Sequence, residues 1–172
     1  MFNAVPRQHT TWFRLSGGFL GSEVVLAVGG VALTLVVGLR RRRFRHLVVG
    51  LATAAASVVA AELLKHVLLS RPSTAAPAAV SNSFPSGHTA VAAAVTVALW
   101  FVVSPRWRPA VVIVGGLLCA LVGVVTVVQQ WHRPSDAVSA YALVAACACA
   151  GGAALVPWQG PPDRGSPGAT AN

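Results

Sequence analysis

Long apolar runs constrain this chain more than any other feature of its sequence. Residues 109–128 contain no charged side chain, and residues 137–156 contain none either. A helix needs about 20 mostly apolar residues to cross the hydrocarbon core of a bilayer. An ordinary soluble domain is excluded, because 55% of the residues are hydrophobic and only 10% are charged. The sequence therefore predicts an integral-membrane protein.

Five runs of this kind predict an all-α bundle of about five transmembrane helices. The first carries Glu23 near its start, and the second is uncharged until Glu62. The third run is shorter than a normal span, so we expect a short helix there. The predicted spans are 19–39, 47–69, 89–103, 109–128 and 137–156. We place a transmembrane domain at 19–158, between an interfacial or flexible segment at 1–18 and a Gly/Pro/Ser-rich tail at 159–172 that we expect to be disordered.

The basic residues predict how the chain is oriented. Thirteen Lys and Arg residues against four Asp and Glu residues give a net charge of +9. A nucleic-acid partner is not expected, because the arginines form a cluster between two apolar runs rather than a stripe along one surface. Short cytoplasmic loops are rich in Lys and Arg, so we expect this cluster and the C-terminus to be cytoplasmic. Loops 70–85 and 129–135 are then extracytoplasmic. The cluster consists of Arg40, Arg41, Arg42, Arg43 and Arg45.

The three cysteines, Cys119, Cys147 and Cys149, all lie inside apolar runs. Free cysteine in such surroundings behaves as a small hydrophobic residue, so we expect all three to be buried. A disulfide framework or a zinc site is not indicated.

Ionisable residues gather at the outer end of the second predicted span. Glu62, Lys65 and His66 are spaced i, i+3 and i+4, which places them on one face of a helix. Charged residues inside a span are costly and often mark function. For Glu62, an ion pair with Lys65 near the membrane surface explains the residue as well as a catalytic role does. For His66, a plain interfacial position is the favoured interpretation.

Residues 84–89, Phe-Pro-Ser-Gly-His-Thr, open the third predicted span. Ser86 can cap the helix, and Gly87 removes the Cβ that would obstruct a phosphate. The first-turn amides and the positive end of the helix dipole then face the anion, and His88 stands beside it with a proton to donate. The alternative is an ordinary helix cap with an incidental histidine, but Pro-Ser-Gly-His is too rare by chance to favour it.

Residues 131–136, Trp-His-Arg-Pro-Ser-Asp, lead into the last predicted span. Pro134 suits the first helical position, which places His132 just before the helix and Asp136 in its first turn. A carboxylate at this spacing can accept the Nδ1 proton of the imidazole and leave Nε2 as a directed nucleophile. The spacing alone is a weak signal, but its location at the same membrane face as residues 85–88 strengthens it.

Cations that could hold a phosphate lie near both segments. Lys65 and Arg71 can act as a clamp, although both could also be ordinary interfacial residues. Arg133 could turn back over the site, while pairing with lipid headgroups is the simpler explanation. A metal mechanism is poorly supported, because two-metal phosphatases use several carboxylates and we expect Glu23 and Asp163 to be remote from the site. The sequence therefore predicts covalent histidine chemistry without a metal or another cofactor.

Together these residues resemble the type 2 phosphatidic acid phosphatase superfamily of membrane lipid phosphatases, which is related in fold to vanadium-dependent haloperoxidases. That family carries the motifs K-x6-R-P, P-S-G-H and S-R-x5-H-x3-D. The second motif is met in full, which implies phosphate binding by Ser86 and Gly87 and general acid catalysis by His88. His132 and Asp136 match the end of the third motif, implying a phosphohistidine-forming nucleophile and its orienting carboxylate.

Two departures from the family pattern stand out. The first motif is one residue shorter, Lys65-x5-Arg71-Pro72, and still implies phosphate ligands. The Ser-Arg of the third motif would fall at Val125-Thr126, so one arginine of the family's phosphate clamp is absent. Family members usually have six spans, and here one N-terminal span fewer is predicted.

We therefore expect a metal-independent membrane phosphatase acting on the phosphate headgroup of a bilayer lipid at the extracytoplasmic face. By analogy with similar proteins a polyprenyl phosphate or pyrophosphate is favoured, with phosphatidic acid and phosphatidylglycerophosphate as alternatives. A degenerate member that binds lipid phosphate without turnover is the competing hypothesis, because of the missing arginine. A proton-coupled carrier using Glu62, Lys65 and His66 would leave residues 85–88 unexplained. The sequence does not specify an oligomeric state.

Overall fold

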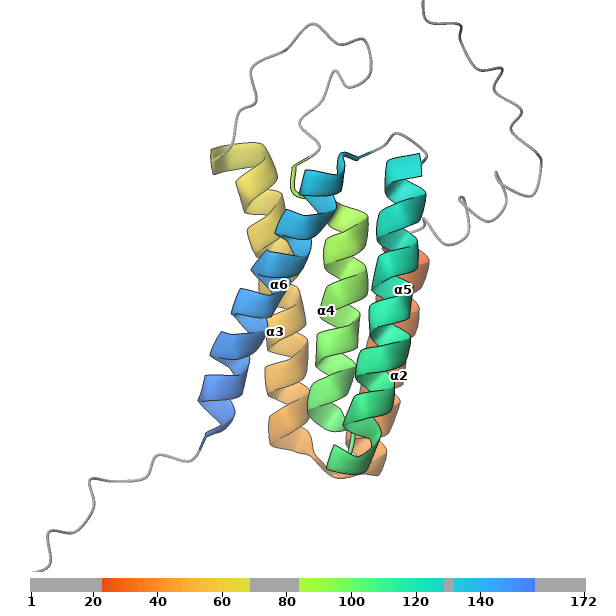
Figure 1. Cartoon of the computed structure of the whole chain (residues 1–172). Helices are drawn as coiled ribbons and strands as arrows, with labels where there is room; N and C mark the ends of the chain where they lie inside the picture. Colours follow the sequence, from red (N-terminus) through yellow and green to blue (C-terminus); the bar gives the residue numbers. More distant parts are fainter. Residues whose placement is uncertain (1–22, 69–83, 129–131, 157–172) are drawn as a thin grey trace, which may run out of the picture.

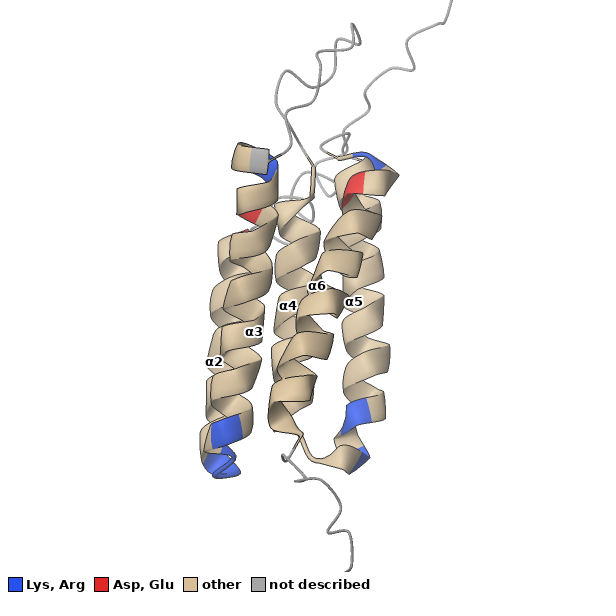
Figure 2. Cartoon of the chain, turned by 90° about the vertical axis from the view of Figure 1, so that its left-hand side faces the viewer, with Lys and Arg blue, Asp and Glu red and all other residues tan. Residues whose placement is uncertain are grey.

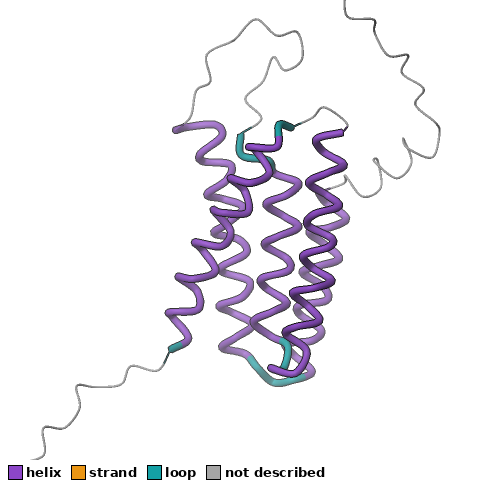
Figure 3. The backbone as a smooth tube through the Cα atoms, in the orientation of Figure 1, coloured by secondary structure: helices purple, strands orange, loops and turns teal. Residues whose placement is uncertain are grey.

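The computed structural model describes residues 23–68, 84–128 and 132–156. Its helices run side by side in one bundle, and each is antiparallel to the next helix along the chain (Figure 1). No strand occurs in these three ranges, which Figure 3 shows as helices joined by short connections. The all-α prediction is confirmed. The helices are α2 (Glu23–Arg40), α3 (Phe44–Leu63), α4 (Gly87–Val102), α5 (Arg108–Val128) and α6 (Pro134–Leu155).

Two short helical turns extend this set. A π-helical turn, η1 (Leu64–Leu68), continues α3, and a 3₁₀ turn, η2 (Pro105–Trp107), leads into α5. With these turns included, four of the described helices are long and apolar enough to span a membrane. The fifth, α4, has 16 residues, which agrees with the short third span that the sequence predicts.

The short helix α4 is the centre of the bundle and packs against α2, α3, α5 and α6. The alanines of α4 are buried, and Ala90 and Ala94 are at most 2% exposed. Glycines on the neighbouring helices let the backbones approach closely. A Cβ at Gly30 of α2 would clash with Val95, and one at Gly115 of α5 would clash with Thr96. Small residues therefore replace large apolar ones as the packing material, as is common between membrane helices.

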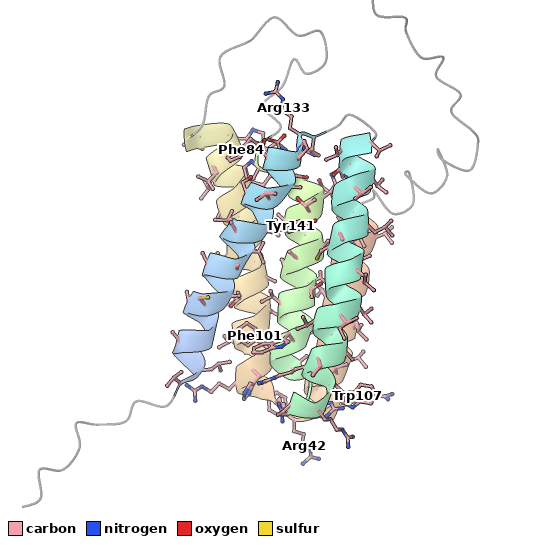
Figure 4. The ribbon with its side chains drawn as sticks, in the orientation of Figure 1. Arg42, Phe84, Phe101, Trp107, Arg133 and Tyr141 are labelled. Atoms are coloured by element: carbon pink, nitrogen blue, oxygen red, sulfur yellow. The ribbon has the colours of Figure 1, made fainter. Side chains whose placement is uncertain are left out.

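The arginine cluster lies at one end of the bundle (Figure 2). The side chain of Arg43 donates a hydrogen bond of 3.2 Å to the carbonyl of Val103, and Arg45 donates one of 2.9 Å to the carbonyl of Ala154. These carbonyls belong to the C-terminal ends of α4 and α6, where a cation is favourable. Trp107 lies at this end too (Figure 4), where the membrane interface favours tryptophan. The cluster thus ties helix ends together, besides the topological role predicted for it.

Several predictions fall outside the described residues, namely segment 1–18, tail 159–172 and Arg71. Of the three cysteines, all free, Cys119 and Cys147 are partly buried. Cys149 is exposed, so the prediction that it is buried in the protein is wrong. The physical reason is that an apolar span residue can face lipid instead of the bundle interior.

Candidate active site

Five helix ends meet at the end of the bundle opposite the arginine cluster. They are the starts of α2, α4 and α6 and the ends of α3, with η1, and α5 (Figure 1). Most of the predicted site residues lie here, while Arg71 is outside the described ranges. The residues brought to this end are Lys65, Ser86, Gly87, His88, His132, Arg133 and Asp136.

His132 and Asp136 are held at the start of α6. Pro134 is the first helical residue, as predicted, and Arg133 is the N-cap residue with extended backbone angles (φ −85°, ψ 155°). Asp136 is fully buried, and its Oδ2 accepts a hydrogen bond of 3.0 Å from the Arg133 amide. The same oxygen lies 3.9 Å from Nδ1 of His132. The helix start therefore fixes the carboxylate that faces the imidazole.

Backbone hydrogen bonds bring three helix ends together around the two histidines. The Ser86 amide donates to the carbonyl of Asp136 (3.1 Å), and the His132 amide donates to the carbonyl of Thr126 (3.2 Å). The rings of His88 and His132 meet edge to face, with 6.1 Å between their centroids and 63° between their planes. Their side chains are 20% and 10% exposed. Both imidazoles are therefore largely buried and lie close to each other.

Ser86 occupies the N-cap position of α4, but its side chain makes no cap hydrogen bond, so the predicted capping role of the hydroxyl is wrong. Thr89 instead donates a hydrogen bond of 3.1 Å to the Ser86 carbonyl. The Ser86 hydroxyl is buried and has no hydrogen-bond partner among the described residues. A buried hydroxyl without a partner is costly in free energy. This hydroxyl is consequently well suited to bind a polar ligand.

Glu23, the first residue of α2, belongs to this site, and the expectation that it is remote is wrong. Its Oε1 lies 3.0 Å from Nδ1 of His88. The physical reason is that α2 and α4 are alternate spans, so both begin at the same end of the bundle, and the two helices pack together. A Cβ on Gly87 would lie 2.8 Å from the same carboxylate oxygen. The glycine therefore leaves room for Glu23. The order of the predicted spans could have placed Glu23 at this end, because alternate spans begin on the same side of the membrane.

A second group of ionisable side chains at this end of the bundle consists of Glu62, Lys65 and His66. Glu62 Oε1 lies 3.9 Å from Lys65 Nζ, which is the ion pair that the sequence offers as one of two explanations for Glu62. Glu62 Oε2 lies 3.0 Å from Nε2 of His66, whose side chain is 65% exposed. Lys65 and His66 are in the π-helical turn, a kind of distortion that is frequent at functional sites.

Comparison with known proteins gives the family. The sequence model of the PAP2 superfamily matches residues 64–160, more than half of the chain. The chain belongs to the PAP2 superfamily. Neither a search of curated proteins nor a search of solved structures found a match. The resemblance seen in the motifs is confirmed, and the chain is accordingly a multi-pass membrane phosphatase.

The PAP2 match covers both histidine segments and Lys65, whereas Glu23 and α2 lie outside it. It also covers Thr126, where the third motif would place an arginine. Thr126 is fully buried, and its hydroxyl donates a hydrogen bond of 2.9 Å to the Gly123 carbonyl. Arg133 is exposed, and its side chain points away from the end of the bundle (Figure 4). Thr126 therefore lies beside His132 without a charge, whereas Arg133 carries a charge that is directed outward.

Proposed function

We propose that this PAP2 protein hydrolyses a lipid phosphate or diphosphate at the extracytoplasmic face through a phosphohistidine intermediate. The observation that carries the proposal is the pair of facing imidazoles, 6.1 Å between centroids, with the buried carboxylate of Asp136 behind one of them. An imidazole with a carboxylate behind it is the arrangement of a nucleophile. The second imidazole, 6.1 Å away, can donate a proton to the leaving group.

In the first step Nε2 of His132 attacks phosphorus while the bond from phosphorus to the leaving oxygen breaks. The electron pair of that bond goes to the leaving oxygen, and His88 supplies its proton. In the second step water attacks the phosphohistidine, His88 takes a proton from the water, and inorganic phosphate leaves with His132 restored. Asp136 stabilises the positive charge that His132 carries between the two steps.

The phosphate oxygens need donors and positive charge in this mechanism. The buried hydroxyl of Ser86 can donate one hydrogen bond, since it has no other partner in the described part of the chain. Lys65 is 25% exposed at the same end and supplies a cation, and Arg71 is proposed from its motif position alone. Gly87, next to Ser86 at the start of α4, keeps this approach free of a side chain.

An apolar groove supports a substrate with a long hydrocarbon chain. It has a volume of about 870 Å³, runs between α2 and α5 and has α4 at its base. Binding pockets of small molecules span roughly 300–1,000 Å³. The groove begins at Val25, two residues from Glu23, and extends to Trp107 at the arginine end. A lipid tail in this groove would have its headgroup at the histidines. A polyprenyl chain is the favoured tail, with diacylglycerol lipids as alternatives.

The orientation is proposed from charge. The arginine cluster lies at the opposite end from the histidines, and cytoplasmic ends of spans are the ones rich in arginine. The histidines would then face the extracytoplasmic side, where the substrate would be a lipid of the outer leaflet.

The test is phosphate release by the purified protein in detergent, measured with a panel of polyprenyl and diacyl lipid phosphates. His132→Ala is expected to abolish turnover in a folded protein, and wild-type rates in this variant would contradict the phosphohistidine mechanism. In kcat/KM, which reports the first step, His88→Ala is expected to lose about 10²–10⁴-fold with lipid alcohols as leaving groups and less with nitrophenol, which needs no proton. Tight binding of lipid phosphate without any release would favour the degenerate alternative, which the uncharged Thr126 suggests.

Metal independence is tested separately. EDTA should leave the rate unchanged, and strict dependence on added Mg²⁺ would contradict this mechanism. Vanadate, which mimics the five-coordinate, trigonal-bipyramidal transferring phosphoryl group, should inhibit at lower concentration than phosphate, because an enzyme binds the transition state more tightly than the product.

A further inference from the structure

We propose that Glu23 is a positioning residue for His88, and that its carboxylate does for this imidazole what Asp136 does for His132. The inference rests on the proposed function, in which His88 is the general acid. Glu23 would accept a hydrogen bond from Nδ1–H of His88, which leaves Nε2 to deliver the proton to the leaving oxygen. The proton moves from Nε2 to that oxygen, and Glu23 keeps its charge throughout.

The distances carry this assignment. Glu23 Oε1 lies 3.0 Å from Nδ1 of His88, whereas Asp136 Oδ2 lies 3.9 Å from Nδ1 of His132. In both cases the carboxylate approaches Nδ1, so Nε2 of each ring is the nitrogen left for the substrate. A carboxylate on Nδ1 fixes the tautomer and orientation of an imidazole and stabilises its charged form.

Gly87 supports the same assignment. A Cβ at this position would lie 2.8 Å from Oε1 of Glu23, closer than real Cβ contacts. A side chain on residue 87 would therefore push the Glu23 carboxylate off His88. The small residue before the histidine thus serves the contact between α2 and α4, besides any contact with phosphate.

The alternative is that Glu23 only stabilises the start of its own helix. An acidic residue in the first turn of a helix interacts favourably with the helix dipole. That role would not depend on His88, and its loss would slow the reaction of every substrate alike. Positioning of a general acid predicts a different result in kcat/KM, which reports the first step alone and not the hydrolysis of the phosphohistidine that all substrates share. In this first step only leaving groups that need a proton are affected.

Glu62 offers a matched control. Its side chain is 44% exposed, as is that of Glu23, and both carboxylates lie near Gly87. Glu62 contacts Lys65 and His66, whereas Glu23 contacts His88. Replacing either glutamate by glutamine removes one negative charge from the same end of the bundle. Only Glu23→Gln removes the carboxylate from the proposed general acid.

The experiment compares two substrates with one hydrocarbon chain, a long-chain alkyl phosphate and a nitrophenyl phosphate that carries the same chain on its ring. Glu23→Gln should lower kcat/KM on the alkyl phosphate by about 10–100-fold, as large a loss as when a metal-bound histidine loses its orienting partner. On the nitrophenyl phosphate the loss should be only a few-fold. Glu62→Gln should leave the ratio of the two rates at its wild-type value. Equal losses on both substrates in Glu23→Gln would overturn the proposal.

A double mutant sharpens the test. With His88→Ala as background, Glu23→Gln should cause no further loss on the alkyl phosphate, because its effect passes through the missing imidazole. Fully additive losses would overturn the positioning role. Glu23→Asp keeps the charge and serves as the second variant if the glutamine protein does not fold. Glu23→Asp should retain part of the rate on the alkyl phosphate that Glu23→Gln loses.

A measurement without turnover separates this inference from the proposed function. In ¹⁵N-histidine protein in bilayers, the signals of His88 are identified by their loss in His88→Ala. Wild-type Nδ1 should carry a proton, and its signal should shift in Glu23→Gln but not in Glu62→Gln. An Nδ1 without a proton, or an unchanged signal in Glu23→Gln, would overturn the inference whatever the activity. Absence of phosphate release with this signal pattern intact would overturn the proposed function while supporting the contact.

Discussion

Replacing Asp136 by asparagine separates the charge of this buried side chain from its shape. The amide oxygen can keep the hydrogen bond from the Arg133 amide, which Oδ2 now accepts at 3.0 Å. In the wild type the Ser135 hydroxyl donates a hydrogen bond of 3.3 Å to Oδ1 of Asp136. In the variant the amide nitrogen takes the place of Oδ1 and can donate to the same hydroxyl. The start of α6 should therefore survive, and Tm should change little. Asp136→Ala would instead lose the bond to Arg133, at a cost of about 1 kcal/mol.

The loss in rate follows from the distance between the two charged groups. Two unit charges separated by 3.9 Å, as His132 Nδ1 and Asp136 Oδ2 are, interact by about 4 kcal/mol at an effective dielectric constant of 20. If about half of the positive charge on His132 has formed in the transition state, about 2 kcal/mol of stabilisation is lost. Each 1.36 kcal/mol is tenfold in rate, so kcat should fall by about 30-fold, and by about 1,000-fold if the full charge has formed.

The assay is kcat for phosphate release from a lipid phosphate, with Tm measured on the same detergent preparation. Ser135→Ala is the matched control, because it removes a contact to the other carboxylate oxygen without changing the charge. It should stay within about threefold of wild type, the effect of one weak hydrogen bond. A folded Asp136→Asn protein whose kcat also stays within that range would refute the electrostatic role of the carboxylate.

Two further predictions concern orientation and substrate. A cysteine at Ser81, which lies outside the described residues, should react with an impermeant thiol reagent in intact cells, in a background without native cysteines, whereas one at Ser104 should not. The reverse labelling would place the histidines in the cytoplasm. Gly29→Leu should raise KM for long-chain substrates more than for short-chain ones, because Gly29 lines the apolar groove and a Cβ there meets no atom within 4 Å. Gly116→Leu has the same free space outside the groove and is the control; equal effects on both chain lengths would exclude tail binding there.

Apolar runs located the helices because bilayer thickness sets their length. The predicted span 89–103 corresponds to α4 at Gly87–Val102, and 109–128 to α5 at Arg108–Val128. The start of the last helix was less well placed, since the apolar run begins at residue 137 and α6 begins at Pro134. Hydropathy misses the polar first turn of a helix. The preference of proline for the first helical position correctly predicted the start at Pro134.

The histidine segments could also be predicted from the sequence, because the residues within each segment are close together along the chain. His132 and Asp136 are one helical turn apart, so the helix alone brings them together. The contact between Glu23 and His88 is different, since it depends on how α2 packs against α4. The buried, unpartnered state of the Ser86 hydroxyl likewise depends on surrounding helices that its own segment does not specify.

The last prediction concerns Thr126, where the family motif has an arginine. The Thr126 carbonyl accepts the hydrogen bond from the His132 amide, so this position borders the nucleophile. That bond joins backbone atoms and does not involve the Thr126 side chain. Replacement by arginine loses the side-chain bond to Gly123 and places a long side chain at a fully buried position. The guanidinium can escape burial only by extending toward the bundle end, which is where the phosphate would lie.

Thr126→Arg should therefore raise kcat, because a hydrogen bond from a charged group contributes about 1.5–3 kcal/mol, or roughly 10–100-fold. Thr126→Met has a long uncharged side chain and controls for bulk at this buried position. Arg133→Lys should change kcat little, because the exposed, outward-pointing side chain of Arg133 fits a lipid headgroup better than a bidentate clamp. A folded Thr126→Arg protein no faster than Thr126→Met, together with a slow Arg133→Lys, would show instead that Arg133 already provides the missing charge.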